Sequence, residues 1–412
     1  MRARGGGLTT DALYENPGHL KVELSVRGLR LDAGLRDRLF EGTEARASTD
    51  IDLLLPEDVW VQAPIDERWT AGSPFTLAAE AGRFRLRRAD RTPLEVRVLA
   101  PPDFYRRRTS EGRPMGQLAE VHGNFVAIDP AAACGFGSRG LPCAFCRGLG
   151  PAAAPTLPSV AEVVEVVRAA FDEGAAEFVY FRSRCSDAPD GGLEGLRPYI
   201  LGVKKHFDTL IAAELDPPLE GRDVDRAYAA GIDAVSYNLE IFDPATLERV
   251  CPRRARAVGR DRYLEALRRA AAIFPAGTVW CELVVGVEPL DSTRTAIDTL
   301  TAMGVLPVLS VVGPAAADEA GLAPPSPEEL CPVYAHLYEA VKRQRTPMTW
   351  VRDLPIGITP LDARFFVDES DRLAVTSFYR SRLGTLAARS LSRLRRRLRV
   401  KTVSESFDSS RL

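Results

Sequence analysis

Three closely spaced cysteines are the strongest chemical signal in this sequence. Cys134, Cys143 and Cys146 stand in CGFGSRGLPCAFC, where eight residues separate the first pair and two separate the second. Two cysteines that are two residues apart can reach one metal centre from a single tight turn. The glycines of the longer loop let the backbone fold back and deliver the third thiol. Three thiolates without a fourth bind a [4Fe–4S] cluster incompletely and leave one iron open, so the spacing indicates such a cluster.

Two other interpretations of the three cysteines remain open at this point. A zinc site would need a fourth ligand, and His122 is the histidine that lies near them, twelve residues upstream of Cys134. Alternatively, the thiols are inert and packed like small hydrophobic side chains. The other cysteines form no closely spaced pairs, which predicts one cluster rather than two. These other cysteines are Cys185, Cys251, Cys281 and Cys331.

The elements that must position this loop follow an alternating pattern of strands and helices. Six strand–helix units are expected from about residue 117 to residue 345. Consecutive units of this kind predict an α/β fold with a parallel sheet, and six units suggest a partial barrel that stays open. The cysteine loop follows the first strand, at the edge where such folds build their sites. The expected strands are 121–129, 177–183, 209–215, 234–242, 278–288 and 306–312, and the expected helices are 159–174, 193–207, 223–231, 262–274, 293–304 and 327–344.

The regions on either side of the barrel have a different composition. Residues 1–19 are expected to form a flexible leader, and residues 20–116 a β-rich N-terminal domain made of short strands separated by Gly, Pro and Asp. The barrel would occupy residues 117–345, and a C-terminal extension residues 346–412. Leu391, Leu394 and Leu398 follow helical spacing in the basic segment 389–401, which predicts an amphipathic basic helix, and packing of this helix on the barrel is favoured over contact with acidic lipid or RNA.

Charge and hydropathy exclude several classes of protein. The 412 residues carry a net charge of −2, which gives no electrostatic reason to expect binding to nucleic acid. No apolar run approaches the roughly 20 residues of a membrane helix, so an integral membrane protein is not expected. The first residues lack the hydrophobic stretch of a secretory signal. We therefore expect a cytoplasmic protein with reduced thiols.

The loop and the expected barrel together resemble the radical S-adenosylmethionine superfamily. The ending Cys143-Ala144-Phe145-Cys146 places an aromatic residue before the last cysteine, as in that family, although the family usually has three residues where this loop has eight. The resemblance implies that the three cysteines hold a [4Fe–4S] cluster whose open iron binds S-adenosylmethionine. Reductive cleavage would then give a 5′-deoxyadenosyl radical that abstracts hydrogen from an unidentified organic substrate.

The same resemblance implies partners and cofactor contacts. A small-molecule substrate and a low-potential electron donor of the flavodoxin or ferredoxin type are expected, and an RNA-modifying radical enzyme is the alternative within the superfamily. Asn238 and Glu240 resemble the Asn-Leu-acid motif of biotin- and lipoyl-synthase-type enzymes, which contacts the ribose of S-adenosylmethionine. Gly286 resembles the glycine stretch that lies against the adenine, and Phe145 belongs to the same cofactor-binding set.

Other expected contacts depart from the family pattern. The Gly-Gly-Glu-like element that usually binds the methionine amino group is absent, and Ser183 is the candidate to replace it. Arg260 and Arg262 open the helix after the fourth strand and are candidates for the methionine carboxylate.

Three further side chains are candidates for catalysis in the barrel. Glu214 ends the third strand, and its carboxylate suits proton transfer. Glu282 has the same strand parity as Gly286, so we expect it to point into the same cavity. Tyr180 is a candidate radical relay.

Overall fold

The computed structural model describes most of the chain. The described residues are 16–43, 49–130, 134–136, 143–144, 157–183, 185–186, 188–312, 317, 321–322, 325–348, 350–353 and 357–368. Phe145, Cys146 and the basic tail therefore lie outside the described residues. In the described part, no helix is long and apolar enough to span a membrane.

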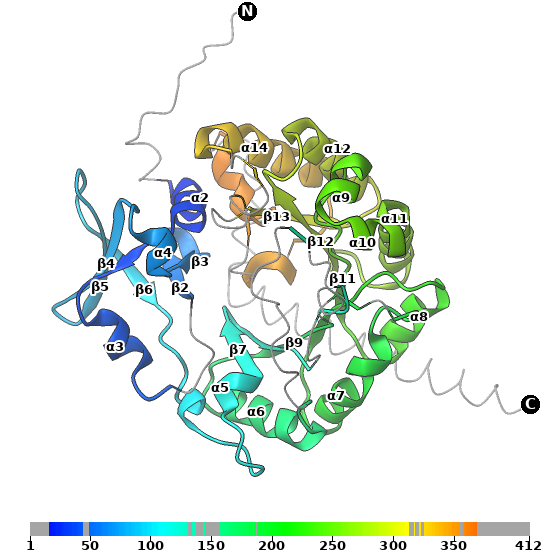
Figure 1. Cartoon of the computed structure of the whole chain (residues 1–412), viewed down its shortest axis with the longest axis horizontal. Helices are drawn as coiled ribbons and strands as arrows, with labels where there is room; N and C mark the ends of the chain where they lie inside the picture. The colour runs from blue at the N-terminus through cyan, green and yellow to red at the C-terminus, as the bar shows by residue number, and fades with distance from the viewer. Residues whose placement is uncertain are drawn as a thin grey trace, which may run out of the picture.

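A curved sheet of seven strands forms the centre of the molecule, and helices surround it (Figure 1). The strand order β13-β12-β11-β10-β9-β8-β7 follows the sequence without a crossover. All neighbours from β8 to β13 are parallel, and β7 pairs antiparallel to β8. This topology confirms the partial (β/α)6 barrel. The strands are β7 (Ala119–His122), β8 (Phe125–Ile128), β9 (Phe178–Arg182), β10 (Ile211–Glu214), β11 (Ala234–Ser236), β12 (Val279–Val285) and β13 (Leu306–Val311).

Six long helices follow the strands of the barrel, as the periodicity predicts. Two of them begin with a capping box, in which Ser159 pairs with Glu162 and Ser326 pairs with Glu329, so the unpaired N–H groups of their first turns are satisfied. Two short helices that the sequence did not predict, α9 (Pro244–Val250) and α10 (Pro252–Ala257), lie between β11 and α11. The long helices are α6 (Val160–Asp172), α7 (Leu193–His206), α8 (Arg222–Ala229), α11 (Arg260–Ile273), α12 (Leu290–Ala302) and α14 (Pro327–Gln344).

The N-terminal region contains a second sheet with its own hydrophobic core. Its six strands have the order β1-β4-β5-β6-β2-β3. The strands are β1 (Arg30–Leu31), β2 (Asp50–Leu55), β3 (Val59–Pro64), β4 (Phe75–Glu80), β5 (Arg83–Arg88) and β6 (Leu94–Val98). The short helical segments are α3 (Leu35–Phe40), η1 (Pro56–Asp58), α4 (Glu67–Thr70), η2 (Asp103–Arg106) and α5 (Met115–Leu118).

The N-terminal region begins with a helix, although short strands were expected from residue 20 onward. The segment that begins at residue 20 belongs to helix α2 (Pro17–Arg27), whose first turn also contains residues assigned to the leader. The Asn16 side chain caps this helix and proline occupies its first position, and Leu20 and Leu24 are buried on one face at a spacing of one helical turn. These helix start signals and the four-residue spacing of the buried leucines explain why a helix forms where short strands were expected.

Two boundaries within the barrel also differ from the expectation. Residues 121–129 were expected to form one strand, but a turn at Gly123 divides them into the hairpin β7–β8. The fourth strand was expected to reach residue 242, whereas β11 ends at Ser236.

The chain returns to the barrel and to α2 after α14. The short helix η4 (Trp350–Asp353) comes first, Ile358 then pairs with Leu309 of β13, and the short helix η5 (Asp362–Phe366) follows. Lys21 of α2 and Asp362 of η5 form an ion pair of 2.7 Å in which the lysine side chain is fully buried.

Candidate active site

The described residues of the cysteine loop are anchored to two segments of the barrel. Cys134 is buried and Cys143 is half-buried. The N–H of Gly135 donates to the carbonyl of Cys185 at 2.9 Å, and the N–H of Ala144 donates to the carbonyl of Val250 at 3.0 Å. The two described cysteines are thus attached to the segment after β9 and to the end of α9. Cys146 and Phe145, the remaining expected members of this loop, lie outside the described residues.

Two cysteines that looked isolated in the sequence lie beside this loop. The side chain of Cys185 lies beside that of Cys134, and the side chain of Cys251 lies beside that of Cys143. The neighbouring Cys251 thiol is the main cause of a lowered pKa at Cys143. The sequence did not predict either contact, because the members of each pair lie far apart in the chain and meet only in the folded barrel.

Ser183 lies at the end of β9, close to the same segment. Its side chain is 6% exposed, and its hydroxyl oxygen has no hydrogen-bond partner among the described residues. A buried hydroxyl without a partner costs free energy, which a bound ligand would restore. Two of the three thiols expected to hold a cluster, together with a polar group that lacks a described partner, thus belong to segments at one end of the barrel, and the third thiol, Cys146, lies outside the described residues.

Asn238 and Glu240 do not lie on a strand, although the sequence pattern suggested that they share one face. Glu240 has a φ of 64°, a left-handed conformation that is uncommon for a residue with a side chain and that interrupts strand parity. Its N–H donates to the carbonyl of Glu282 at 2.9 Å. The amide oxygen of Asn238 accepts the N–H of Glu282 at 3.1 Å. Both residues are therefore anchored on β12, and Asn238 is 8% exposed.

Arg254 is the central residue that sequence reasoning missed. It is 2% exposed and donates to the Glu240 carboxylate, to the carbonyl of Asn238 and, at 2.8 Å, to the hydroxyl of Tyr263. Tyr263 in turn donates to Asp216 at 2.9 Å. Burial raises the pKa of Asp216 to about 6, against the opposing effect of Arg254. Many arginines surround position 254 in the sequence, so no local signal distinguishes this one.

Arg260 and Arg262, the arginines that the sequence suggested instead, occupy the first turn of α11. The Arg260 guanidinium lies 5.2 Å from the centre of the Phe242 ring and forms an ion pair of 3.1 Å with Asp261. It is Arg254 that reaches the interior beside Asn238 and Glu240.

The packing around position 286 requires a glycine. Its φ is 98°, and an added Cβ would lie 2.6 Å from Cδ of Pro325 and 3.0 Å from Cγ1 of Val312. The packing of the chain against this position therefore explains the glycine without a ligand.

The barrel interior contains two carboxyl groups whose pKa values burial raises to near neutral pH. The Tyr180 hydroxyl donates to Glu214 at 3.0 Å, and Ser310 donates to Glu282. Burial raises the pKa of Glu214 and of Glu282 to about 7 in each case. The three catalytic candidates from the sequence thus belong to one buried polar layer, in which Glu214 and Glu282 are able to exchange protons near neutral pH.

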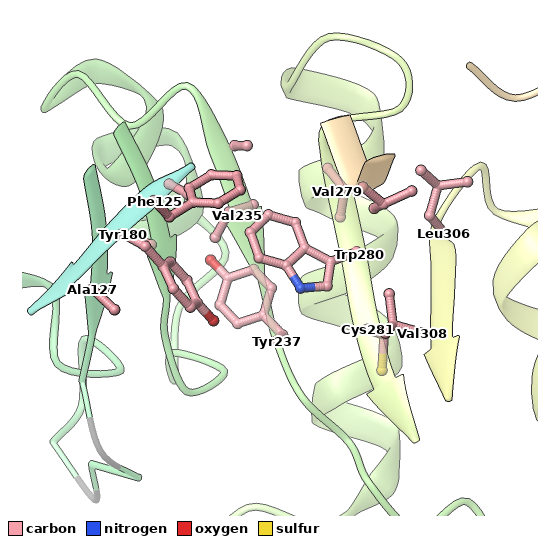
Figure 2. Packing of buried hydrophobic residues seen from close by; sticks show 14 of the residues in the cluster. Phe125, Ala127, Tyr180, Val235, Tyr237, Val279, Trp280, Cys281, Leu306 and Val308 are labelled. Carbon is pink, nitrogen blue, oxygen red and sulfur yellow. The ribbon is translucent and has the colours of Figure 1, made fainter. Parts of the chain in front are cut away.

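Aromatic side chains pack inside the barrel next to this polar layer, and Tyr180 belongs to both groups. Figure 2 shows Trp280 projecting from β12 toward Tyr180 and Phe125 on the opposite strands. The ring centres of Tyr180 and Trp280 are 6.0 Å apart, and those of Phe125 and Tyr180 are 6.5 Å apart. Trp350 covers Phe125 from the C-terminal segment at 6.3 Å. One end of the barrel is therefore apolar, and the ionisable groups lie toward the other end.

A chain of charged side chains connects this interior with the N-terminal sheet. Arg182 of β9 forms ion pairs with Asp129 and with Glu120 of β7. Nδ1 of His122 is 3.3 Å from Asp52 of β2, and its Nε2 is 3.5 Å from Glu120. Burial lowers the pKa of His122, but hydrogen bonds to the two carboxylates outweigh burial and raise it to about 9. The histidine of the zinc alternative thus has both ring nitrogens engaged by carboxylates.

This chain of charges borders a cavity of about 770 Å³ between the N-terminal region and the first hairpin of the barrel. Its lining includes Trp60 and Asp50 of the N-terminal sheet and Glu120, His122 and Arg182 of the barrel.

Comparison with known proteins gives one curated relative and several solved structures. The chain is 26% identical over 171 residues to bacteriochlorophyllide c C-7(1)-hydroxylase from Chlorobaculum limnaeum, which covers 40% of this chain and 42% of that protein. A radical SAM methyltransferase from Sphaerobacter thermophilus is 16% identical, with a TM-score of 0.38 over 65% of this chain and 75% of its own. Coproporphyrinogen III oxidase (HemN) from Escherichia coli, described as a radical SAM enzyme, is 13% identical, with a TM-score of 0.36 over 55% and 54%. The chain resembles the radical S-adenosylmethionine enzymes.

No protein-family model matches the chain. The chain spans less than half of the curated relative's length and about half of HydG from Carboxydothermus hydrogenoformans, to which it is 16% identical with a TM-score of 0.43 over 54% of this chain. Within this likeness to radical S-adenosylmethionine enzymes, the substrate is an open question.

Proposed function

We propose that the protein is a radical S-adenosylmethionine enzyme acting on a small or medium-sized organic molecule. Cys134, Cys143 and Cys146 would hold a [4Fe–4S] cluster. When bound, the cluster and S-adenosylmethionine supply a 5′-deoxyadenosyl radical that removes hydrogen from the substrate. The observation that carries the proposal is the attachment of the cysteine loop to the segments after β9 and at the end of α9, close to the buried hydroxyl of Ser183, which has no hydrogen-bond partner in the described part of the chain.

The chain's own residues prepare this site in a definite way. Ser183 would accept or donate a hydrogen bond at the methionine part of the cofactor, and Phe145 would lie beside the last cysteine. Arg254 fixes Glu240 and the backbone of Asn238, so both residues are held before a ribose arrives. Such fixed polar groups lose little conformational freedom on binding. Arg260, Arg262 and Gly286 are the remaining proposed contacts.

The buried carboxyl groups would serve the substrate. With a pKa of about 7, Glu214 and Glu282 can each hold a proton or release it near neutral pH. Tyr180 orients Glu214 through its hydroxyl. The aromatic side chains below exclude water from this layer, which protects a reactive intermediate from side reactions.

A hydroxylation is the first reaction to test, because the curated relative is named as a hydroxylase. The proposal also requires a low-potential electron-donor protein, which would reduce the cluster.

Replacing the loop cysteines provides the test of this function. The triple variant Cys134→Ala/Cys143→Ala/Cys146→Ala should bind no iron after anaerobic reconstitution, whereas the wild type should bind about four irons per chain. Wild-type protein given S-adenosylmethionine and a strong reductant should release 5′-deoxyadenosine, and the triple variant should release none.

Cys331→Ala is the matched control, because this thiol lies on α14 and contacts the carbonyl of Pro327. It should keep the iron of the wild type. Retention of about four irons by the triple variant would show that the cluster is bound elsewhere, and tightly bound zinc in the wild type would support the zinc alternative.

A further inference from the structure

Cys185 lies against a cysteine of the loop, Cys134, although 50 residues separate the two in the sequence. The N–H of Gly135, the residue after Cys134, donates to the carbonyl of Cys185 at 2.9 Å, and the two cysteine side chains lie beside each other. Cys185 has a φ of 48°, so the segment is held in an uncommon backbone conformation at this contact. Two segments joined both by backbone and by thiols keep the sulfur atoms close to each other.

Cys251 has the same relation to the second described cysteine of the loop. The N–H of Ala144, the residue after Cys143, donates at 3.0 Å to the carbonyl of Val250, the residue before Cys251, and the two cysteine side chains lie beside each other. Cys251 is 1% exposed and Cys143 is half-buried. Each pair therefore combines one partly exposed thiol, at position 143 or 185, with one buried thiol.

We propose that Cys134 with Cys185, and Cys143 with Cys251, form two disulfides when the loop is empty, and that these disulfides block cluster assembly until they are reduced. The disulfides themselves do not depend on the proposed function, whereas the block on cluster assembly does. Because two of the three proposed cluster ligands would be consumed, the loop cannot bind iron in this state.

The oxidant is a low-molecular-weight disulfide such as oxidised glutathione. The partly exposed thiol of a pair, as thiolate, attacks one sulfur of the oxidant, forms a mixed disulfide and releases one thiol. The buried thiol then attacks the protein sulfur of the mixed disulfide and releases the second thiol. Each pair thus gives two electrons and two protons to the oxidant, which becomes two thiol molecules.

The two other described cysteines have different surroundings and serve as controls. Cys281 of β12 is fully buried, and its sulfur accepts the N–H of Leu239 at 3.4 Å. Cys331 of α14 lies 3.8 Å from Nδ1 of His19.

Peptide mapping of the full-length apoprotein tests the proposal. Iron is removed with a chelator under reducing conditions, oxidised glutathione is added without oxygen, and disulfides are mapped by mass spectrometry without reduction. Both predicted disulfides are expected, with four of the seven cysteines lost to alkylation. Cys185→Ser should remove the first disulfide only and Cys251→Ser the second only, while Cys331→Ser should leave both.

A disulfide between Cys143 and Cys146, or free Cys185 and Cys251 after oxidation, would overturn the proposal. Iron uptake provides the second measurement: oxidised protein should take up no iron until a dithiol reductant is added, and uptake without reductant would contradict the block. Disulfide mapping uses the apoprotein, so the two disulfides can be absent even if the reduced protein binds iron. It can also succeed in a protein that never binds iron, which separates this proposal from the proposed function.

Discussion

Glu214→Gln tests the inference that burial raises the pKa of this carboxyl group inside the barrel. Glutamine has nearly the same shape, and its amide oxygen can still accept the hydrogen bond from Tyr180. The substitution therefore removes the ionisation of Glu214 and leaves the packing of the layer close to that of the wild type.

The magnitude follows from the pKa of the buried group. A rise from 4.5 to about 7 corresponds to about 3 kcal/mol between the two protonation states. Below pH 4.5 the group is protonated in both the folded and the unfolded chain, so it contributes no difference. Between pH 4.5 and 7 the unfolded chain releases the proton first, so the wild type loses stability as the pH rises. Above pH 7 Glu214 is ionised in both states, and the folded protein is destabilised by the full amount of about 3 kcal/mol.

Chemical denaturation of the reduced apoprotein at several pH values measures this effect. Glu214→Gln should have nearly the same free energy of unfolding as the wild type at pH 4.5. It should be more stable by up to about 3 kcal/mol at pH 8 and above. Glu265→Gln is the control, because it makes the same change of charge on the exposed face of α11.

A difference between Glu214→Gln and the wild type that does not change with pH would refute the reasoning. It would mean that the Glu214 carboxyl group is solvated in the folded protein, and the proposed proton exchange at this layer would lose its basis.

Three further predictions concern other parts of the site. Asn238→Ala should weaken S-adenosylmethionine binding in calorimetric titration by roughly 0.5 to 3 kcal/mol and leave the iron content unchanged; unchanged binding would assign this residue to structure alone. Arg254→Met should lower the free energy of unfolding by about 3 to 5 kcal/mol, because it leaves Glu240 without its cation; a loss below 1 kcal/mol would contradict this. Gly286→Ala should destabilise the protein by more than Gly304→Ala, since both positions have a positive φ but only Gly286 meets Pro325; equal losses would show that the backbone alone matters.

The features that the sequence predicted are local in character. The spacing of Cys134 and Cys143 is written in a single segment, and each helix of the barrel repeats its apolar residues every three or four positions. Such patterns do not depend on distant segments. For this reason the order of the barrel elements and the place of the cysteine loop in the chain could be predicted without the structure.

The features that were missed depend on contacts between distant segments. Arg254 acquires its role only because β11 ends early and Glu240 turns toward it. Cys185 and Cys251 reach the loop across intervening strands and helices. The alternation around Glu240 resembled a longer strand, since a pattern of side chains does not reveal a positive φ.

The buried ion pair between Lys21 and Asp362 has a consequence for any attempt to divide the protein. It joins the first described helix to one of the last described segments, and the same Asp362 oxygen also accepts hydrogen bonds from the N–H and the hydroxyl of Thr359. A fragment that ends after α14 would leave the Lys21 ammonium group inside the protein without a counter-charge, which is strongly unfavourable. Helix α2 is therefore fastened to η5, and a cut at residue 116 would place the two members of this ion pair on separate fragments.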